Sequence, residues 1–415
     1  MHILIIHQAF ASPNEPGGTR HYELARYLVQ QGHQVTIVAS DLTYLTGRRE
    51  STRNGFSAEE NLGGVRILRA YTYAALHRSF CWRVLSFFSF MATSVLTSMR
   101  VSKVDVVMGT SPPIFQAFSA WLVAALRGRP FLLEIRDLWP EFAIDMGVLN
   151  NPLLIRLSRW LEMFLYRKSD HLLVNSPAYR DYLVAKGVAK ARITLIPNGV
   201  DPDLFHPRDK GWRIRNQLGM DGRFLVTYAG ALGLANDIPT ILRAASRLTN
   251  HDDIRFLLVG DGKQRRHSEG LASEMGLKNV VFAGSRPKSE MPEILAASDV
   301  CIATLKNIPM FRTTYPNKVF DYMAAGRPTI LAIDGVIRQV VESAKGGVYV
   351  PPGDDAALAE AARILKKHPK QAEGMGVAAR SYVVRHFNRH QQAQAFGNLV
   401  ERLAEQNAAS LNELD

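Results

Sequence analysis

Short runs of β-branched and other apolar residues alternate with longer helical patterns along almost the whole chain. This alternation is typical of parallel sheets built from strand–helix–strand units, in which helices cover both faces and leave the strands apolar throughout. The fold class is therefore α/β. In the first half the expected strands are residues 2–7, 34–40, 65–71, 105–111, 131–137, 171–176 and 192–198, and a second series comprises 224–230, 255–260, 280–284, 300–305 and 329–333.

The length of 415 residues favours two domains of roughly 200 residues each. The stretch 197–212, rich in Pro, Gly and Asp, interrupts the alternation. Two doubly wound domains that face one another would leave a cleft lined by the carboxyl ends of their strands. The expected divisions are a first domain over 1–200, a linker over 201–222, a second domain over 223–385 and a helical segment over 386–415 that packs back toward the first domain.

The chain carries a net charge of +12, and most of it lies in the first half. Residues 1–200 hold 22 Lys and Arg against 14 Asp and Glu, a net +8, while the remainder hold 28 against 24, a net +4. Such a basic half suits anionic lipid or a phosphorylated substrate. Nucleic acid is disfavoured, because the sequence has no zinc-finger spacing and no repeating basic and aromatic pattern.

The location of the protein is suggested by three features of the sequence. Cys81 and Cys301 match no metal spacing and indicate a reducing compartment. The opening MHILIIHQAF has the pattern of a strand, so we expect no signal peptide. The uncharged run 84–99 is too short to span a bilayer, and its sequence leaves open a buried helix or an interfacial membrane helix.

A first candidate anion site follows the first expected strand. Gly17 and Gly18 allow close approach of the backbone, and Arg20 and His21 open the next helix, whose N-terminal amides suit an anion. The turn lacks the G-x-G-x-x-G spacing, and the chain has no Walker A motif. Hydride transfer and ATP hydrolysis are therefore disfavoured.

A second candidate anion site lies in FRTTYPNKVFDYMAAGRPTI, residues 311–330. Asn317 is expected to cap a helix that begins beside Lys318, so that free amides and an ammonium could receive a phosphate. Asp321 lies one turn further and suits a ribose diol. The alternative is an ordinary capped surface helix.

A third candidate site follows the expected strand 131–137. Arg136 and Asp137 end this strand, and charged residues there tend to face the ligand. The alternative is a surface ion pair of Arg136 with Glu141 or Asp145. The D-x-D of Asp201 to Asp203 could hold a metal, but its place in a Pro- and Gly-rich stretch favours a turn, and we expect no essential metal and no cofactor.

Seven fragments in order carry a resemblance that covers nearly the whole chain. GGTRHYELARYL, GHQVTIV, RDLWPE, IPNGVD, LVGDG, ASDVCIATL and PNKVFDYMAAGRP together resemble the retaining glycosyltransferases of the GT-B fold, family 4. Within that family they look most like the bacterial O-antigen and capsule subgroup that includes L-fucosamine (N-acetyl-fucosaminyl) transferases.

This resemblance implies roles for specific residues. The glycine loop would lie against the donor diphosphate, the helix of PNKVFDY would bind its phosphates, and Asp321 would bind the ribose. Asp137, Arg136 and Lys318 are the expected catalytic residues, and His21, Trp139 and Glu141 the acceptor-binding residues. The expected donor-binding residues are Gly17, Gly18, Arg20, Gly230, Gly260, Ser285, Arg286, Arg312, Asn317, Lys318, Val319 and Asp321.

The sequence departs from the family pattern at several positions. The first glutamate of the E-x7-E motif is replaced by Thr313, and the two cations after the first strand of the second domain are replaced by Ala231 and Asp237. Lys318 and Arg312 are therefore the expected sources of positive charge at the phosphates.

The function implied by the resemblance is transfer of a sugar, with retention, from a nucleotide sugar to a polyprenyl-diphosphate-linked saccharide. UDP is the expected nucleotide, and an N-acetylated amino sugar is one candidate for the sugar. The enzyme would work in the cytoplasm at the anionic inner face of the cell membrane, without nucleic acid. A nucleotide-sugar epimerase of the same fold and a non-catalytic sugar-nucleotide-binding protein stay open, and the acceptor, linkage and oligomeric state are undetermined.

Overall fold

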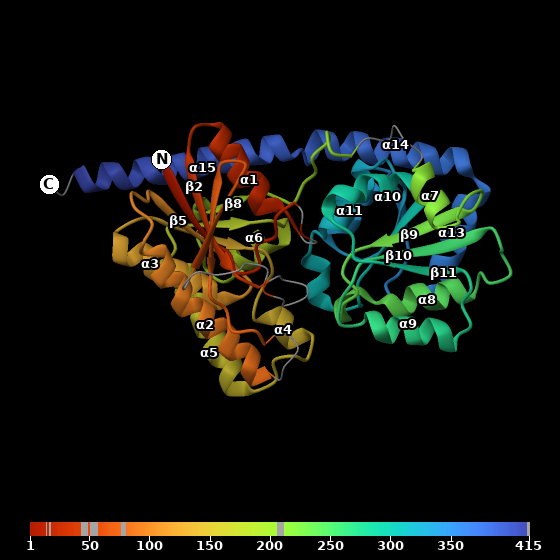
Figure 1. The fold of residues 1–415 in the computed structure, drawn as a ribbon, viewed down its shortest axis with the longest axis horizontal. Helices are drawn as coiled ribbons and strands as arrows, with labels where there is room; N and C mark the ends of the chain where they lie inside the picture. The colour runs from red at the N-terminus through yellow and green to blue at the C-terminus, as the bar shows by residue number, and fades with distance from the viewer. Residues whose placement is uncertain are drawn as a thin grey trace. The chain divides into compact units, whose positions relative to one another are not determined.

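The computed structural model describes residues 1–13, 15, 18–42, 49, 57–75, 80–205 and 211–412. They form two compact units (Figure 1). The N-terminal unit contains most residues up to Pro197 together with those from His390 onward, and the C-terminal unit contains Asn198–Arg389. Each unit is an α/β domain with its own sheet, so the expected fold class is confirmed.

The sheet of the N-terminal unit has, within the described residues, the strand order β3-β4-β2-β1-β5-β6-β7-β8. All neighbouring strands are parallel except β3 and β4, which are antiparallel. The order reverses between β1 and β5, where α/β sheets bind ligands. The strands are β1 (His2–Ile6), β2 (Gln34–Ser40), β3 (Ser57–Leu62), β4 (Val65–Ala70), β5 (Val106–Ser111), β6 (Phe131–Ile135), β7 (His171–Val174) and β8 (Ile193–Leu195).

Helices cover both faces of this sheet. The helix α1 packs on one face, and α3 packs on the other, where a Cβ on Gly109 would lie 2.5 Å from the Cβ of Ala120. The helices of the unit are α1 (Arg20–Gln30), α2 (Phe80–Ser98), α3 (Ile114–Arg127), α4 (Glu141–Asp145), α5 (Pro152–Lys168), α6 (Pro177–Ala185) and α15 (Arg389–Asn412).

The C-terminal helix α15 is part of the core of the N-terminal unit. Its Phe396 and Val400 are fully buried beside Ile3, Ile5 and Leu28 of β1 and α1. The chain therefore crosses from the C-terminal unit back to the first sheet, and α15 covers the same face as α1.

The sheet of the C-terminal unit has the strand order β11-β10-β9-β12-β13-β14, and all its neighbouring strands are parallel. Its order reverses between β9 and β12. The strands are β9 (Phe224–Ala229), β10 (Ile254–Val259), β11 (Val280–Gly284), β12 (Val300–Thr304), β13 (Thr329–Ala332) and β14 (Gly347–Tyr349). The helices are α7 (Trp212–Gln217), α8 (Ile238–Ser246), α9 (Arg265–Glu274), α10 (Met291–Ala297), α11 (Asn317–Ala324), α12 (Val336–Ser343), α13 (Asp355–Lys367) and α14 (Pro369–His386).

The segment expected as a linker, 201–222, contains the helix α7. Arg213 of α7 pairs with Glu293 of α10, and the positive-φ residue Gly211 lies against the backbone of Ala297. This part of the chain therefore belongs to the C-terminal unit.

The loops that follow β9 and β10 are each bonded through their backbones to the last residue of the neighbouring strand. The Gly230 N–H donates to Val259 O at 2.9 Å, and the Gly260 N–H donates to Gly284 O at 2.8 Å. Gly260 has a φ of +144°, and a Cβ there would lie 1.9 Å from Gly230 O. Glycine at position 260 therefore permits the close approach of the two loops at the carboxyl edge of the sheet.

Replacing Gly260 with Ala is expected to destabilise the protein, because the new methyl group would overlap the Gly230 carbonyl. The expected loss is about 1–3 kcal/mol in the free energy of unfolding, measured by urea denaturation. Gly270 in α9 is the matched control, since a Cβ there meets nothing within 4 Å. Gly270→Ala should stabilise by about 0.5–1 kcal/mol. Equal effects of the two substitutions would contradict this account of the loops.

Candidate functional site

The helix α11 begins one residue earlier than the sequence suggested. Pro316, in an extended conformation, occupies the N-cap position, and Asn317 is the first helical residue and is exposed. The prediction of Asn317 as the cap was therefore wrong, because the φ fixed by the proline ring suits the extended N-cap. No side chain among the described residues caps this helix. Val319 is buried, and its N–H donates to Pro316 O at 3.1 Å.

The side chain of Lys318 extends from α11 to the carboxyl end of β9. Its Nζ donates to Tyr228 Oη and to Asn236 Oδ1, each at 2.7 Å, and lies 4.3 Å from the centre of the Tyr228 ring. A Cβ on Gly230 would lie 3.1 Å from this Nζ. Burial lowers the pKa of Lys318 to about 7. The structure thus brings Lys318, Gly230 and Gly260 together beside the point where the strand order reverses.

Tyr322 fixes α11 to the end of β9. Its hydroxyl accepts from the Ala229 N–H at 2.8 Å and donates to Ala229 O at 2.9 Å. Tyr322 follows Lys318 by one helical turn, so the helix face that carries Lys318 is also the face that packs. Sequence reasoning missed Tyr228, Asn236 and Tyr322, because their proximity to Lys318 depends on tertiary contacts.

Asp321 points toward a different partner. Its carboxylate pairs with Lys288, which follows β11 and whose Nζ also lies 5.2 Å from the centre of the Phe205 ring. Lys288 is thus a cation in this region that the sequence analysis did not assign. A ribose-binding role for Asp321 stays a prediction.

The other expected donor-binding side chains of this unit are more exposed. Arg286 lies 3.6 Å from Glu290, and Ser285 is exposed beside it. Arg312 lies 4.0 Å from Asp334, which follows β13, and β12 separates β13 from β9, where the Lys318 ammonium lies. The described contacts therefore do not bring Arg286 or Arg312 to Lys318.

Arg20 opens α1 but does not present its guanidinium to solvent. The side chain is 5% exposed, and its Nη1 and Nη2 donate to Pro197 O and Ile196 O, each at 2.8 Å. Its Nε donates to Glu134 Oε1 at 3.1 Å. This geometry gives Arg20 a positioning role between α1, β6 and the end of β8, and gives no support to a contact with the donor diphosphate. Gly17 lies outside the described residues, and Gly18 is exposed.

His21 shares the same carboxylate. Its Nε2 lies 2.5 Å from Glu134 Oε2, and its ring centre lies 4.2 Å from that of His7, which follows β1. Burial opposes ionisation of Glu134, but His21 and then Arg20 outweigh it and hold the pKa of Glu134 well below its usual range. Glu134 is the one charged residue in the otherwise apolar sequence of β6, and this feature of the sequence could have predicted a buried carboxylate with partners.

Asp137 follows β6 and keeps partial exposure. Burial raises the pKa of Asp137 to about 6, against the opposing charge of Arg136 and a 3.5 Å contact with the Tyr179 hydroxyl. Arg136 donates through Nη2 to Pro112 O at 3.0 Å. A partly protonated carboxyl at a strand end can orient or exchange protons with a substrate hydroxyl near neutral pH.

The expected acceptor-binding residues Trp139 and Glu141 have partners within the N-terminal unit. Both carboxylate oxygens of Glu141 accept from Arg159 of α5 at 2.9 Å. The ion pair of Arg136 with Glu141 considered from the sequence is therefore not formed. The Trp139 ring lies edge-on to Phe115, with centroids 6.4 Å apart.

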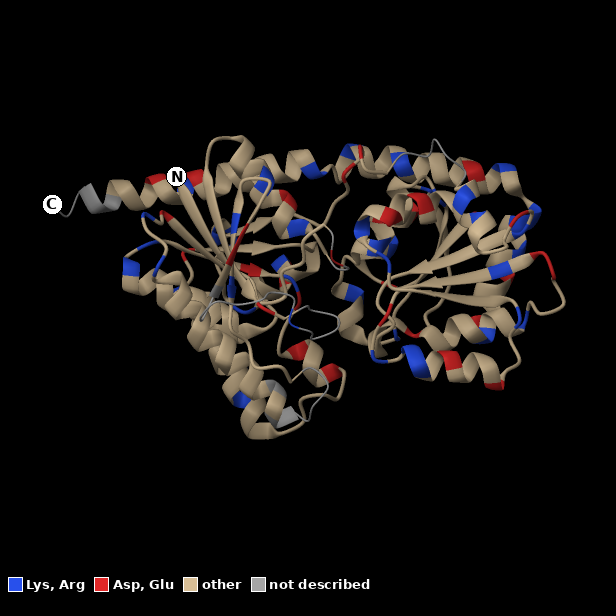
Figure 2. Ribbon diagram, viewed as in Figure 1, with Lys and Arg blue, Asp and Glu red and all other residues tan. Residues whose placement is uncertain are grey.

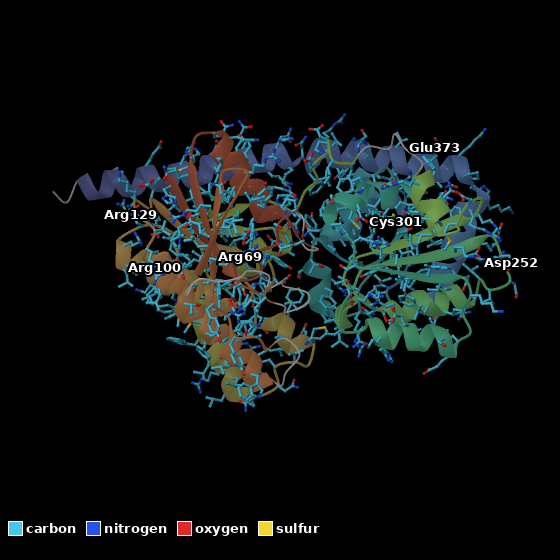
Figure 3. All side chains as sticks on the ribbon, viewed as in Figure 1. Arg69, Arg100, Arg129, Asp252, Cys301 and Glu373 are labelled. Carbon is cyan, nitrogen blue, oxygen red and sulfur yellow. The ribbon has the colours of Figure 1, made fainter. Side chains whose placement is uncertain are left out.

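Two other sequence features have structural roles. Asp201 Oδ1 accepts from the N–H groups of Asp203 and Leu204 at 2.9 and 3.3 Å, the pattern of a turn-forming aspartate. Cys301, labelled in Figure 3, is fully buried in β12, and burial raises the pKa of its thiol to about 12. A thiol that stays protonated at neutral pH is a poor nucleophile.

The lowered pKa of Lys318 predicts a pH dependence of stability. Between about pH 7 and pH 10.5 the unfolded chain binds more protons at this lysine than the folded protein does, so the free energy of unfolding should rise with pH in this window. Lys318→Met removes this contribution, so its urea-denaturation stability should fall relative to wild type as the pH rises. The exposed Lys278→Met is the control and should parallel wild type. Parallel curves for Lys318→Met would show that Lys318 has an ordinary pKa.

Comparison with known proteins agrees with this geometry. Residues 17–199 match the glycosyl transferase 4-like domain, and residues 218–368 match glycosyl transferases group 1. The putative colanic acid biosynthesis glycosyl transferase WcaI of Escherichia coli K12 is 24% identical over 387 residues, which cover 91% of this chain and 94% of that protein.

Solved structures share the fold over almost the full length. Sucrose-phosphate synthase from Thermosynechococcus elongatus has a TM-score of 0.77 at 21% identity, covering 97% of this chain and 98% of that one. Anabaena Alr3699/HepE in complex with UDP and glucose has a TM-score of 0.73 at 16% identity, covering 96% and 99%. The chain belongs to the glycosyltransferases of the GT-B fold, with a glycosyl transferase 4-like domain followed by a group 1 domain.

Proposed function

We propose that this glycosyltransferase moves a sugar, with retention, from a UDP-sugar to a polyprenyl-diphosphate-linked saccharide during synthesis of a cell-surface polysaccharide such as O-antigen or capsule. The observation that carries the proposal is the Lys318 ammonium held beside Gly230 at the reversal point of the C-terminal sheet. The name of WcaI refers to colanic acid biosynthesis, and HepE was solved with UDP and glucose, so both relatives favour this assignment. An N-acetylated amino sugar, as in the fucosaminyltransferases, is the first donor sugar to test.

The donor would bind at the C-terminal unit through its diphosphate. The N-terminal amides of α11 and the Lys318 ammonium offer positive charge to the phosphates, and the absence of a side chain at Gly230 lets the Lys318 ammonium lie against the end of β9. When the bond to the anomeric carbon breaks, negative charge grows on the leaving diphosphate. A cation that is already fixed and desolvated stabilises this charge without reorganisation.

The acceptor would bind at the N-terminal unit. Its hydroxyl oxygen forms a bond to the anomeric carbon on the face from which the phosphate oxygen leaves, and its proton passes to that phosphate oxygen. Asp137, with a pKa of about 6, would orient the attacking hydroxyl. This proton route requires no metal ion.

Membrane association is proposed from an apolar face of the N-terminal unit. Seven of its apolar side chains are at least 44% exposed and define this face. The helix expected over residues 84–99 buries one side, where Phe90 and Ser94 are fully buried, and exposes the other. Aromatic neighbours of the seven exposed side chains connect the helices: Phe88 contacts Phe115 of α3 at 5.1 Å, and Trp121 of α3 contacts Phe164 of α5 at 4.7 Å. The apolar face comprises Trp82, Leu85, Phe88 and Leu96 of α2 and Leu153, Leu157 and Trp160 of α5.

The charges around the apolar face are basic. Figure 2 shows α2 and α3 almost without charged residues, and the one acidic residue of α2, α3 and α5 is the buried Glu162. Arg156, Arg167 and Lys168 of α5 are exposed. Apolar side chains flanked by cations suit the surface of an anionic membrane. Within the described part of the chain no helix is long and apolar enough to cross a bilayer.

Transferase activity is tested with purified protein, a panel of nucleotide sugars and a lipid-linked acceptor mimic, in the presence of EDTA. Release of nucleoside diphosphate should require both substrates and should give a product with the donor's anomeric configuration. Lys318→Ala should lower kcat/KM by about 100-fold without unfolding the protein, because it removes a cation at the leaving group. Lys278→Ala is the control.

Three outcomes of this assay would contradict the proposal. An inverted product would exclude retention, and near-normal turnover by Lys318→Ala would remove this lysine from the site. Donor conversion without acceptor would point instead to an epimerase.

Membrane association is tested by sedimentation with vesicles that contain phosphatidylglycerol. The double substitution Leu157→Glu and Trp160→Glu should reduce the bound fraction at least about tenfold, because it places two charges where apolar surface would be buried. Val377→Glu is the matched control, since Val377 is 66% exposed on α14 of the other unit. Unchanged binding of the double variant would exclude this face as the docking surface.

A further inference from the structure

Four neighbouring strands of the N-terminal sheet end in buried polar atoms that have no hydrogen-bond partner within the described residues. They belong to β1, β5, β6 and β7, which lie next to one another in this order. His7 is 1% exposed, Thr110 is fully buried and Asn175 is 7% exposed. The unpartnered atoms are both ring nitrogens of His7, Oγ1 of Thr110, Nε of Arg136 and Oδ1 of Asn175.

The strand register places these side chains on one face of the sheet. Ile6 pairs with Gly109 and Ile135 pairs with Val174, so His7 stands level with Thr110, and Arg136 with Asn175. The ladder continues past the strand ends, since the His7 N–H donates to Val38 O and the Arg136 N–H donates to Ser111 O, each at 2.9 Å. Paired residues of a parallel sheet point to the same side.

That face is the one covered by α1. The other buried polar side chains beside the unpartnered atoms, Glu134, Arg20 and His21, have hydrogen-bond partners. Glu134 is bonded by Arg20 and His21, and the His7 ring packs on His21. This ring contact fixes the His7 imidazole without using its nitrogens. Burial, then the nearby His21 and Arg136, lower the pKa of His7 well below 6.5, so the ring is neutral and carries one donor and one acceptor.

A buried polar group without a partner costs about 1–3 kcal/mol, so several at one edge call for an explanation. Two other unpartnered atoms of this unit, Ser98 Oγ and Arg127 Nε, lie at the C-terminal ends of α2 and α3. Those helix ends lie at the opposite, amino edge of a parallel sheet. The group at the carboxyl edge is therefore specific to the ligand-binding side.

The balance of donors and acceptors identifies the missing partner. His7 and Arg136 each offer an unpaired N–H, while His7 and the Asn175 carbonyl each offer an unpaired acceptor. The diphosphate of a lipid-linked acceptor is esterified at both ends, so it carries acceptors only at neutral pH and would leave both acceptors unpaired. Sugar hydroxyls donate and accept, and two or three of them would satisfy the whole set.

We propose that His7, Arg136 and Asn175 form a subsite for the hydroxyl groups of the acceptor's terminal sugar, rather than for its diphosphate. The inference rests on the proposed function and deepens it by naming the part of the acceptor that the N-terminal unit recognises. His7 and Asn175 are new binding residues, and Arg20, His21 and Glu134 are positioning residues behind them.

The first test is binding to the full chain in the absence of donor. The probes are hexose and N-acetylhexosamine 1-phosphates, with inorganic phosphate as the anion control, and the readout is the ¹⁵N resonances of the histidine rings. The sugar phosphates should shift the His7 resonances, and inorganic phosphate should not. A His7 that responds equally to inorganic phosphate, or to none of the probes, would overturn the proposal.

The second test separates binding from structure with His7→Leu. If the imidazole only fills space, this substitution leaves sugar binding unchanged, which would overturn the proposal. If it binds the sugar, probe affinity should fall and acceptor KM should rise about tenfold, while donor affinity stays the same and the thermal midpoint does not fall. Ser268→Ala is the control, because Ser268 Oγ is a buried unpartnered atom in α9 of the other unit.

A second variant covers the case in which His7→Leu does not fold. Asn175→Ala should raise acceptor KM to a similar extent, and an unchanged KM in this variant would overturn the proposal. The binding test also separates this inference from the proposed function. A chain that binds sugar through His7 but never transfers it would refute the transferase and keep the subsite, whereas transfer with normal acceptor KM in both variants would refute the subsite alone.

Discussion

The desolvated ammonium of Lys318 is the interaction on which the proposed donor site depends. Two uncharged oxygens and an aromatic ring hold it, and no carboxylate appears among its described contacts. Such an arrangement solvates the cation only partly, which is why its pKa falls to about 7. A diphosphate would supply the missing counter-charge. The close packing at Gly230 and the attachment of Tyr322 to β9 both fix the position of this cation.

The N-terminal unit depends instead on a buried ionised carboxylate. Its sheet carries an ionised carboxylate, Glu134, that is fully buried and bonded by Arg20 and His21. Breaking such a pair by removing one partner leaves an uncompensated buried charge, so the network is rigid once formed. This rigidity holds in place the face of the sheet that carries His7, Arg136 and Asn175. A prearranged set that offers acceptors as well as donors suits a sugar better than a diphosphate, whereas the Lys318 ammonium of the C-terminal unit offers only donors.

The sequence predicted the fold well where its signal was local. Apolar runs marked the central strands, but the edge strand β3, with the polar sequence SAEENL, has no such run and was missed. The position of Lys318 in the first turn of α11 could be predicted because the signals for this helix start lie in one short segment. Arg20 was assigned to the donor, although its partners are the carbonyls of Ile196 and Pro197, which no local pattern connects to it. The pairing of Asp321 with Lys288 was hidden for the same reason.

The most direct test of the central claim is the number of protons taken up when UDP binds at about pH 8. It is obtained by titration calorimetry in buffers that differ in ionisation enthalpy. With a pKa of about 7, Lys318 is mostly neutral at this pH and should become protonated beside the diphosphate, so wild type should take up close to one proton per UDP and Lys318→Met close to none. UDP binding with no proton uptake by wild type, or with equal uptake by both proteins, would contradict the account.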